Sequence, residues 1–595
     1  MKTLIATAAA VLGLYGLFLL MSTIGRFDDA PLPGAAATAG AENDPRHEEP
    51  QYGGILNVGT WAITLSALSW DPADWNWKQN HDTGMYFEQL FAADLDKSVR
   101  KGGAFPFTMQ AYLPAGSIRG ELAENGSDEL EWEDPLTVVV HLRKGVMFPD
   151  KPGVMERREL TADDVVFSFE RQRLSPKIIP TYFDHIDKVI ARDEHTVVFR
   201  FKEYNAEWDY RFGYGYYSGI LPRELGLPGE PGAVDVKDWR NAVGSGPFQV
   251  ERFIDGNSQI YVRTPDYWDR ETLNGRQYEI PFIDKLVYRT IKDESTWLTA
   301  LRTGKLDILE AIRWLAVDHL KKTTPELRWS RWLSTNGVFL SMRVDKKPFD
   351  DVRVRRAMNL AVNQPEIVEL FYGGHAELFA YPQKPDFVGY FEPLENMPPS
   401  VQELFTFNPE KAKRLLAEAG YPDGFTFTTQ VSATNPDHLD LIPLIVDYLS
   451  DVGVTMKIQT MEYAAHLSAM TTRNHEKGYL VSSGHVNPTT TLRKSFLSGQ
   501  TWNIAMFSDP DVDARILEML RTRDEAKRQE IARGLTTEML DRAPYLWLPT
   551  QYVYSAWWPW VKNYNGELRA GAQRPGPIYA RLWIDRKMKK EMGFD

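Results

Sequence analysis

The sequence contains no cysteine. A chain without thiols can form no disulfide, no thiolate zinc site and no iron–sulfur cluster, and it offers neither a cysteine nucleophile nor a cysteine for lipid attachment. A chain of 595 residues does not depend on disulfides for stability, so this absence is compatible with an oxidising compartment. The compartment therefore has to be inferred from other features of the sequence.

The common motifs of catalysis are also missing. The chain has no phosphate loop, no G-x-S-x-G nucleophile elbow, no H-E-x-x-H zinc helix and no G-x-G-x-x-G fingerprint. The segment GSGPF at 244–248 superficially resembles a phosphate cradle. However, Pro247 has no N–H to donate and no lysine follows, so a tight turn leading into a strand is expected. We therefore predict that the protein is not an enzyme and has no cofactor.

The chain has fewer basic than acidic residues. The chain has 68 Lys and Arg against 81 Asp and Glu, which gives a formal net charge of −13. Nucleic-acid binding needs clustered basic residues that displace counterions from phosphate, so an acidic surface argues against it. The length and the hydrophobic content of 43% predict more than one domain.

Long hydrophobic runs are confined to the N-terminus. Leu4 to Met21 is uncharged and mostly apolar, at the border between a signal-peptide core and a short membrane-spanning helix. The Ala37-Thr38-Ala39 pattern lies about 18 residues beyond this run, too far for ordinary signal-peptidase cleavage. The favoured interpretation of residues 1–25 is an uncleaved signal anchor, and the alternative is a cleaved signal peptide. In both cases the chain is exported, and residues 26–50 form a flexible tether rich in Pro, Ala, Gly and acids.

Strands and helices alternate along the rest of the chain. The β-branched runs at 136–142 and 195–201 predict strands of an antiparallel or mixed sheet. A strand at 425–431, a helix at 439–452 and a strand at 455–460 follow the β-α-β pattern of an α/β fold.

Two charged clusters have structural explanations. Asp163 and Asp164 follow Thr161, so they are predicted to form the first turn of a helix that Thr161 caps rather than a catalytic pair. The arginines of VRVRRAMNLAVN, which follow two aspartates, are interpreted as the solvated and ion-paired face of a helix rather than an anion site. Asn408 and Pro409 start another predicted helix, which Gly420 ends.

Five segments together resemble the family 5 extracellular solute-binding proteins, the peptide/nickel-type receptors of ABC importers. They occur in the order expected for that family: LTADDVVFSFER (160–171), GSGPFQVERF (244–253), TPDYWDR (264–270), FDDVRVRRAMNLAVNQPEIVELFYG (349–373) and NPEKAKRLLAEAGYPDGF (408–425). The resemblance covers roughly residues 50–590. It implies an α/β fold, the bilobal type II clamshell of periplasmic binding proteins, with mixed sheets flanked by helices and an extra small domain.

The resemblance also implies a division of the chain. Lobe I is expected to comprise residues 50–80, 205–295 and 543–595. The appended small domain is expected at 81–204 and lobe III at 296–542.

The function implied by the resemblance is capture without chemistry. The protein would be a monomeric periplasmic receptor that closes on an oligopeptide-like solute and delivers it to an ABC permease and its ATPase, held near the inner membrane by its N-terminal segment. Alternatives are a receptor for a neutral oligosaccharide and a nickel or metal-complex carrier. His438, His466, His475 and His485 lie in one stretch, but their spacing matches no local ligand pattern, so no metal site is predicted.

Aromatic residues predict part of the ligand site. By the resemblance, the end of the first strand, with Thr60 and Trp61, lies at the mouth of the cleft, where flat rings can contact apolar groups or sugar faces. Trp61 and Trp70 are therefore candidate ligand contacts. The alternative is that both rings seal the lobe.

The other part of the ligand site is predicted in the segment VSSGHVNPTT at 481–490. In dipeptide-binding relatives the matching segment carries the aspartate that holds the peptide amino terminus, and here Gly484 stands in its place, while Asn487-Pro488 replaces Asp-Pro. The arginine that holds the peptide carboxylate is likewise missing from 431–438. We therefore expect an internal or longer peptide, or a neutral molecule, held by neutral hydrogen-bonding groups. The predicted contacts in lobe III are Asn336, Ser482, Ser483, Gly484, His485 and Asn487.

Overall fold

The computed structural model describes most of the chain beyond the predicted anchor and tether. The described residues are 49–60 (backbone only at Thr60), 70–73, 78–109, 111–175, 178, 182–334, 336–484 and 487–594. The predicted anchor (1–25) and nearly all of the predicted tether (26–50) lie outside them. Within these ranges no helix is both long enough and apolar enough to span a bilayer.

The largest sheet has eight strands and is mixed. Its order is β10-β11-β14-β1-β15-β23-β16, with β18 paired to β23. Strand β1 runs parallel to β14 and β15, whereas the other pairs are antiparallel. The bounds are β1 (Ile55–Thr60), β10 (Phe248–Ile254), β11 (Ser258–Arg263), β14 (Lys285–Thr290), β15 (Ile308–Ile312), β16 (Arg328–Leu333), β18 (Ala376–Glu377) and β23 (Thr550–Trp557). GSGPF leads into β10, as predicted.

A four-stranded antiparallel sheet has the order β4-β5-β9-β8. Its strands are β4 (Glu131–Asp134), β5 (Thr137–His141), β8 (Ile186–Asp193) and β9 (Thr196–Phe201), so the strands predicted at 136–142 and 195–201 are confirmed. Helix α3 (Ala162–Arg173) packs on this sheet. The backbone N–H of Thr161 donates to Asp164 at 2.9 Å, so the predicted start of the helix is confirmed as well.

The third large sheet has the order β20-β19-β21-β17-β22. Its strands are β17 (Asn336–Met342), β19 (Phe425–Ser432), β20 (Val454–Met461), β21 (Gly478–Gly484) and β22 (Tyr545–Trp547). Strand β19 runs parallel to β20 and β21, and β17 runs antiparallel to β21 and β22. The predicted strand-helix-strand unit at 425–460 is confirmed.

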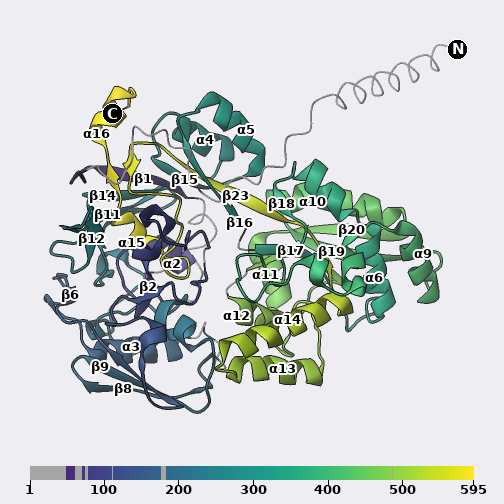
Figure 1. Ribbon diagram of the computed structural model, residues 1–595, viewed down its shortest axis with the longest axis horizontal. Helices are drawn as coiled ribbons and strands as arrows, with labels where there is room; N and C mark the ends of the chain where they lie inside the picture. The colour runs from purple at the N-terminus through teal and green to yellow at the C-terminus, as the bar shows by residue number, and fades with distance from the viewer. Residues whose placement is uncertain are drawn as a thin grey trace. The chain divides into compact units, whose positions relative to one another are not determined.

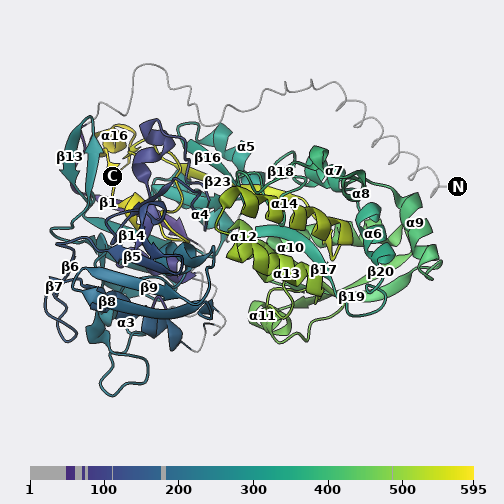
Figure 2. The same cartoon turned by 60° about the horizontal axis from the view of Figure 1, so that its bottom comes forward.

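Helices cover both faces of this sheet. Along β17, Val338 and Leu340 join one hydrophobic core, while Phe339 between them joins a second, because successive side chains of a strand point to opposite faces. Figure 2 shows three of the helices of the second core lying together along the sheet. The helices of the first core are α6 (Val352–Ala361), α9 (Pro409–Glu418) and α10 (Pro436–Ser450), and those of the second include α12 (Pro488–Phe496), α13 (Pro510–Arg521) and α14 (Glu525–Arg542).

The predicted helix starts are confirmed in this part of the chain. Asp351 caps α6, and Asn408 caps α9 with Pro409 in its first turn. Arg353 pairs with Asp351 at 2.6 Å, as the interpretation of local ion pairing requires. For Arg355 the interpretation is wrong, because this side chain is buried and donates to the Phe349 and Arg542 carbonyl groups, each at 2.8 Å.

Two short connections join the eight-stranded and the five-stranded sheet (Figure 1), besides the longer segments that lead from β17 to β18 and from β18 to β19. Strand β16 ends at Leu333 and β17 begins at Asn336, and β22 ends at Trp547 shortly before β23 begins at Thr550. The two passages are neighbours, since the Ser334 N–H donates to the Gln551 carbonyl at 3.1 Å. Strands β15 and β16, from the range assigned to lobe III, pair in the sheet of β1. Strand pairing by itself assigns no domain boundary, so the division into lobes remains a prediction.

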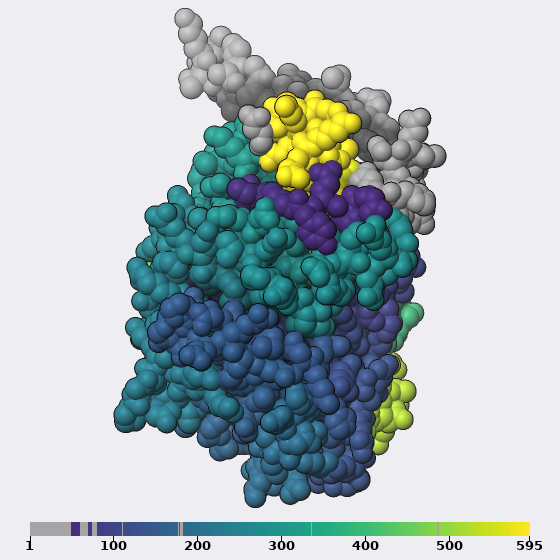
Figure 3. Space-filling view, turned by 90° about the vertical axis from the view of Figure 1, so that its left-hand side faces the viewer, coloured from purple at the N-terminus to yellow at the C-terminus, as the bar shows by residue number. Residues whose placement is uncertain are grey.

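The C-terminal segment packs beside the first described strand. The Gln51 side-chain amide donates to Asp585 at 3.4 Å, and Arg586 at the start of α16 (Arg586–Glu591) donates to the Tyr52 carbonyl at 3.3 Å. Figure 3 shows the C-terminal residues, in yellow, against the purple residues of the first strand. Both ends of the described chain therefore belong to the part that contains the eight-stranded sheet.

Candidate ligand-binding site

The antiparallel pairing of β17 and β21 brings four of the predicted contact residues together. Asn336 lies opposite Gly484, Gly337 opposite Ser483, and Val338 opposite Ser482. This end of the five-stranded sheet is also where the chain arrives from the eight-stranded sheet. The Asn336 side chain is exposed, whereas only 1% of Ser483 is exposed. Of these residues, Asn336, Ser482 and Gly484 can be reached by a solute.

Ser482 is bonded to a histidine from α10. Its Oγ lies 2.7 Å from Nε2 of His438, which is 4% exposed. Burial lowers the pKa of His438 to about 3, so the imidazole is neutral at pH 7. The pair thus presents uncharged hydrogen-bonding groups, the chemistry expected for this segment.

The other predicted residues have roles within the protein or lie outside the described chain. Asn487 is the N-cap of α12, and its Oδ1 accepts from the Thr490 N–H at 2.6 Å. Trp70 is 3% exposed and packs edge-on against Phe253 with ring centroids 5.7 Å apart, which matches the alternative that it seals the lobe. Trp61 and His485 lie outside the described residues, and for Thr60 only the backbone, the last residue of β1, is described.

A lysine that sequence reasoning missed approaches the same place. Nζ of Lys494, on α12, lies 4.0 Å from the position that a Cβ on Gly484 would occupy. It also lies 5.3 Å from the ring centroid of Trp502. Burial and, to a smaller extent, the neighbouring positive charge of Arg493 together lower the pKa of Lys494 to about 7. The site therefore contains an amine that is a cation below this pH, as well as neutral groups.

The residue before this lysine makes a buried ion pair with a distant segment. Nε of Arg493 lies 3.2 Å from Oε2 of Glu207, which also accepts from Arg211 at 2.6 Å and is 0% exposed. Burial alone would raise the pKa of Glu207, but Arg493 and Arg211 outweigh it and lower the pKa to about 2. The Ala206 N–H also donates to the Leu520 carbonyl at 2.8 Å. Residues 206–207 are thus bonded to both α12 and α13.

Comparison with known proteins identifies the family. Residues 117–503 match the model of the bacterial extracellular solute-binding proteins, family 5. The chain belongs to this family. Because the family consists of solute-binding proteins, the chain is a receptor and not an enzyme.

Curated relatives of this solute-binding protein carry different ligands in their names. The chain is 28% identical over 457 residues to the dipeptide-binding protein of Escherichia coli, covering 73% of this chain and 81% of the relative. It is 26% identical over 474 residues to heme-binding protein A of Haemophilus influenzae, covering 74% and 82%.

Solved structures show the same fold. The ABC transporter-associated periplasmic binding protein DppA from Helicobacter pylori, in complex with the peptide STSA, superposes with a TM-score of 0.72 at 24% identity, covering 90% of this chain and 99% of that one. NikZ from Campylobacter jejuni in complex with Ni(L-His) gives a TM-score of 0.69 at 18% identity, covering 88% and 99%. The predicted α/β fold of the bilobal periplasmic binding proteins is confirmed.

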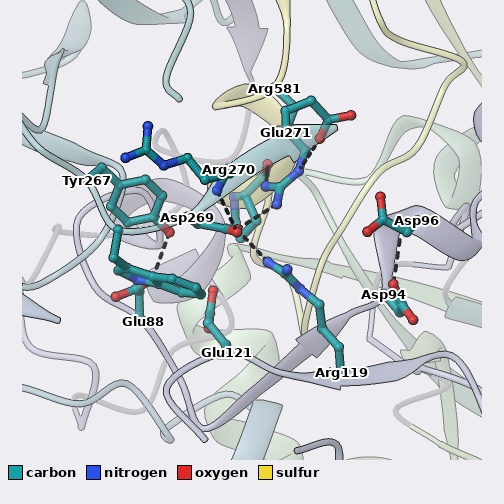
Figure 4. Close-up of polar contacts among 12 residues, drawn as sticks. Glu88, Asp94, Asp96, Arg119, Glu121, Tyr267, Asp269, Arg270, Glu271 and Arg581 are labelled. Carbon is teal, nitrogen blue, oxygen red and sulfur yellow. Dashed lines mark hydrogen bonds and ion pairs between the residues drawn. The ribbon is translucent and has the colours of Figure 1, made fainter. Parts of the chain in front are cut away.

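A group of charged side chains around Asp269 joins separate parts of this solute-binding protein. Asp269 accepts from Arg119 at 2.5 Å and from Arg581 at 2.6 Å, and Arg581 also pairs with Glu271 at 2.8 Å (Figure 4). These residues come from separate parts of the chain. The cluster therefore ties the predicted small domain and the C-terminal segment to residues 269–271.

One carboxyl beside this cluster is uncharged at neutral pH. Oε1 of Glu88 accepts from the Tyr267 hydroxyl at 2.7 Å and from the Trp268 indole at 2.8 Å. Burial, reinforced by the nearby Glu121, raises the pKa of Glu88 to about 8. Glu88 is 0% exposed, so it is out of reach of a solute.

The clustered histidines are bonded within the fold. His466 stacks on Tyr479 with ring centroids 4.1 Å apart, and Nε2 of His475 lies 2.8 Å from the Ile504 carbonyl oxygen. Among the described residues, no three His, Asp or Glu side chains are grouped so that they could hold a metal ion.

Lys494 left one signal in the sequence. It follows the helix cap Asn487 by seven residues, two helical turns, and therefore lies on the same side of the helix as Asn487. The sequence analysis considered only the segment 481–490 as a ligand-binding segment and did not continue to Lys494.

Proposed function

We propose that this solute-binding protein captures an oligopeptide-like solute between two hinged lobes and delivers it, unaltered, to an ABC permease and its ATPase. The observation that carries the proposal is the pair of adjacent passages between the two large sheets, residues 333–336 and 547–550. Two short neighbouring connections are the arrangement that permits rotation of one lobe against the other. The dipeptide-binding and peptide-bound relatives support the ligand class.

These passages also suggest a revised division of the chain. We place the hinge at 333–336 and 547–550, so that β15 and β16 belong with lobe I rather than with lobe III, as their pairing in the sheet of β1 supports. The small domain is kept at 81–204, the segment that contains the four-stranded sheet.

The proposed contact surface lies where β17 begins and β21 ends. Asn336, Ser482 and Gly484 form its described part, and Thr60, Trp61 and His485 are retained as proposed contacts. Ser483, Asn487 and Trp70 are proposed to support the site by packing and capping, since they are nearly buried.

We further propose a periplasmic, monomeric receptor with residues 1–25 as a membrane anchor. Anchoring would keep it near its permease and raise its effective concentration there. The apolar run from Leu4 to Met21 and the family membership support this location.

A thermal-shift screen tests the ligand class. The probes are peptides of two to eight residues, the same peptides with blocked termini, neutral oligosaccharides, and nickel with histidine. A peptide at 100 times its Kd is expected to stabilise the native state by about 2.7 kcal/mol. Stabilisation by oligosaccharides or by the nickel complex alone would contradict the peptide proposal.

A further inference from the structure

Lys494 and Asn336 come close together beside Gly484. A Cβ at Gly484 would lie 2.9 Å from Oδ1 of Asn336, closer than real Cβ atoms come, and 4.0 Å from Nζ of Lys494. Glycine at this position therefore lets the Asn336 side chain lie against the strand, with the Lys494 amine nearby, at the end of the sheet where the ligand is proposed to bind.

The charge of Lys494 is not neutralised within the described part of the protein. Its contact there is the face of Trp502, and no described carboxylate lies within ion-pair distance of Nζ. The adjacent Arg493, in contrast, is paired with Glu207 at 3.2 Å. A partly buried ammonium without an anion is unfavourable, so the position suits an anion that arrives from outside.

We propose that Lys494 binds an anionic group of the ligand, of the carboxylate class, beside Gly484, and that the exposed Asn336 side chain turns its amide N–H toward the same group. This inference rests on the proposed function and adds a ligand chemistry to it. An ammonium and an amide N–H can both donate to one carboxylate. The proposal differs from the expectation from the sequence, which was that this end of the site is neutral. Dipeptide-binding relatives have an aspartate here that holds the peptide amino terminus, whereas this protein has the amine of Lys494.

The test compares matched acid and amide probes by isothermal titration calorimetry. N-acetyl-trialanine and its C-terminal amide differ only in the charged group, and the blocked amino terminus removes a second titrating group. Wild type is expected to bind the acid about ten-fold more tightly than the amide or better, since a charge-assisted hydrogen bond is of that strength. Lys494→Gln is expected to lose the preference, and Lys494→Arg to retain it.

Two further variants separate this role from a structural one. Lys587→Gln, at a side chain that is 83% exposed, is the matched control and should behave as wild type. Gly484→Asp places an internal carboxylate beside Lys494, with the exposed Asn336 side chain displaced, so it should remove the preference for the acid while Lys494 is still present. Equal binding of acid and amide by wild type, or a preference that survives Lys494→Gln, would overturn the inference and leave the receptor function standing.

A second measurement does not depend on a peptide. The side-chain resonance of Lys494, assigned by its loss in Lys494→Gln, is titrated with pH in 100 mM acetate and in 100 mM chloride. Acetate is expected to raise the apparent pKa by half a unit or more, and an unchanged pKa overturns the inference. If neither peptide binds but acetate acts, the anion site stands and the peptide proposal fails.

Discussion

At the scale of single residues, the proposed ligand site depends on the missing side chain of Gly484 and on the amine of Lys494. Without a Cβ at Gly484, the Asn336 side chain lies against the strand, and Lys494 adds a protonatable group beside it. The glycine could be noted from the sequence because it breaks a family pattern. The spacing of Lys494 from Asn487 gives only its side of α12, and its approach to Gly484 depends on tertiary packing that this spacing does not show.

The affinity for an acid probe should depend on pH. In the free protein, burial lowers the pKa of Lys494 to about 7, with Arg493 as the nearest like charge, itself paired with Glu207. Above that pH the free ammonium loses its proton, so binding of N-acetyl-trialanine should weaken as pH rises from 6 to 9, by about ten-fold or more. Titration calorimetry measures this slope. The amide probe and the Lys494→Gln variant should show none, and a flat profile for wild type with the acid would count against the ion pair.

Glu88 should make stability fall as pH rises. Its pKa is raised by burial from an unfolded value of 4.5 to about 8, so the folded protein holds one more proton than the unfolded chain between these values. The free energy of unfolding should therefore decrease from pH 4.5 to pH 8 through this group, by about 2 to 4 kcal/mol. In urea titrations, Glu88→Gln should lack this contribution. The free energy of unfolding of the variant should therefore increase relative to that of wild type as pH rises. A constant difference between the two proteins across this range would show that Glu88 is ionised in the fold.

At the scale of elements, most of the correctly predicted strands and helix starts came from local sequence patterns. Alternation gave β5 and β9, and cap residues gave the starts of α3, α6 and α9, because these signals are local. The sheet to which β15 and β16 belong could not be predicted in this way, since strand pairing joins segments far apart in the chain. Ile308 pairs with Trp557, a partner that no local pattern around residue 308 indicates.

The start of α12 should be sensitive to its cap. The Asn487 side chain accepts from the Thr490 N–H and is 6% exposed, so Asn487→Ala removes the acceptor and leaves a buried N–H unpaired. We expect a loss of about 1 kcal/mol in the free energy of unfolding, measured by urea denaturation. Asn487→Ser retains a capping oxygen and should lose much less. If both variants were as stable as wild type, the cap would contribute nothing.

At the scale of the whole receptor, the contacts of residues 203–207 with α12 and α13 are expected to favour the closed arrangement of the lobes. Arg521 pairs with Glu203 at 2.7 Å, in addition to the pair of Arg493 with Glu207. The sequence analysis assigned residues 203–207 and the helices α12 and α13 to different parts of the fold, but it could not predict that their charged side chains pair. These ion pairs depend on the tertiary arrangement and not on a local pattern.

Arg493→Gln should weaken closure without changing ligand preference. The substitution removes one of the two arginines that pair with a buried carboxylate, and Glu207 keeps Arg211. At pH 6, where Lys494 is protonated in both proteins, affinities for the acid and amide probes should fall by about the same factor, of the order of ten-fold. Lys494→Gln should instead affect the acid alone. A selective loss of acid binding in Arg493→Gln would assign the anion site to the wrong residue.

The proposed function depends on the closure of two hinged lobes on a solute. Small-angle X-ray scattering of the receptor, with and without a saturating peptide chosen from the thermal-shift screen, measures this closure. We expect a smaller radius of gyration with the peptide bound and recovery of the peptide unaltered after incubation. An unchanged radius of gyration at saturation, or conversion of the peptide into a product, would contradict it.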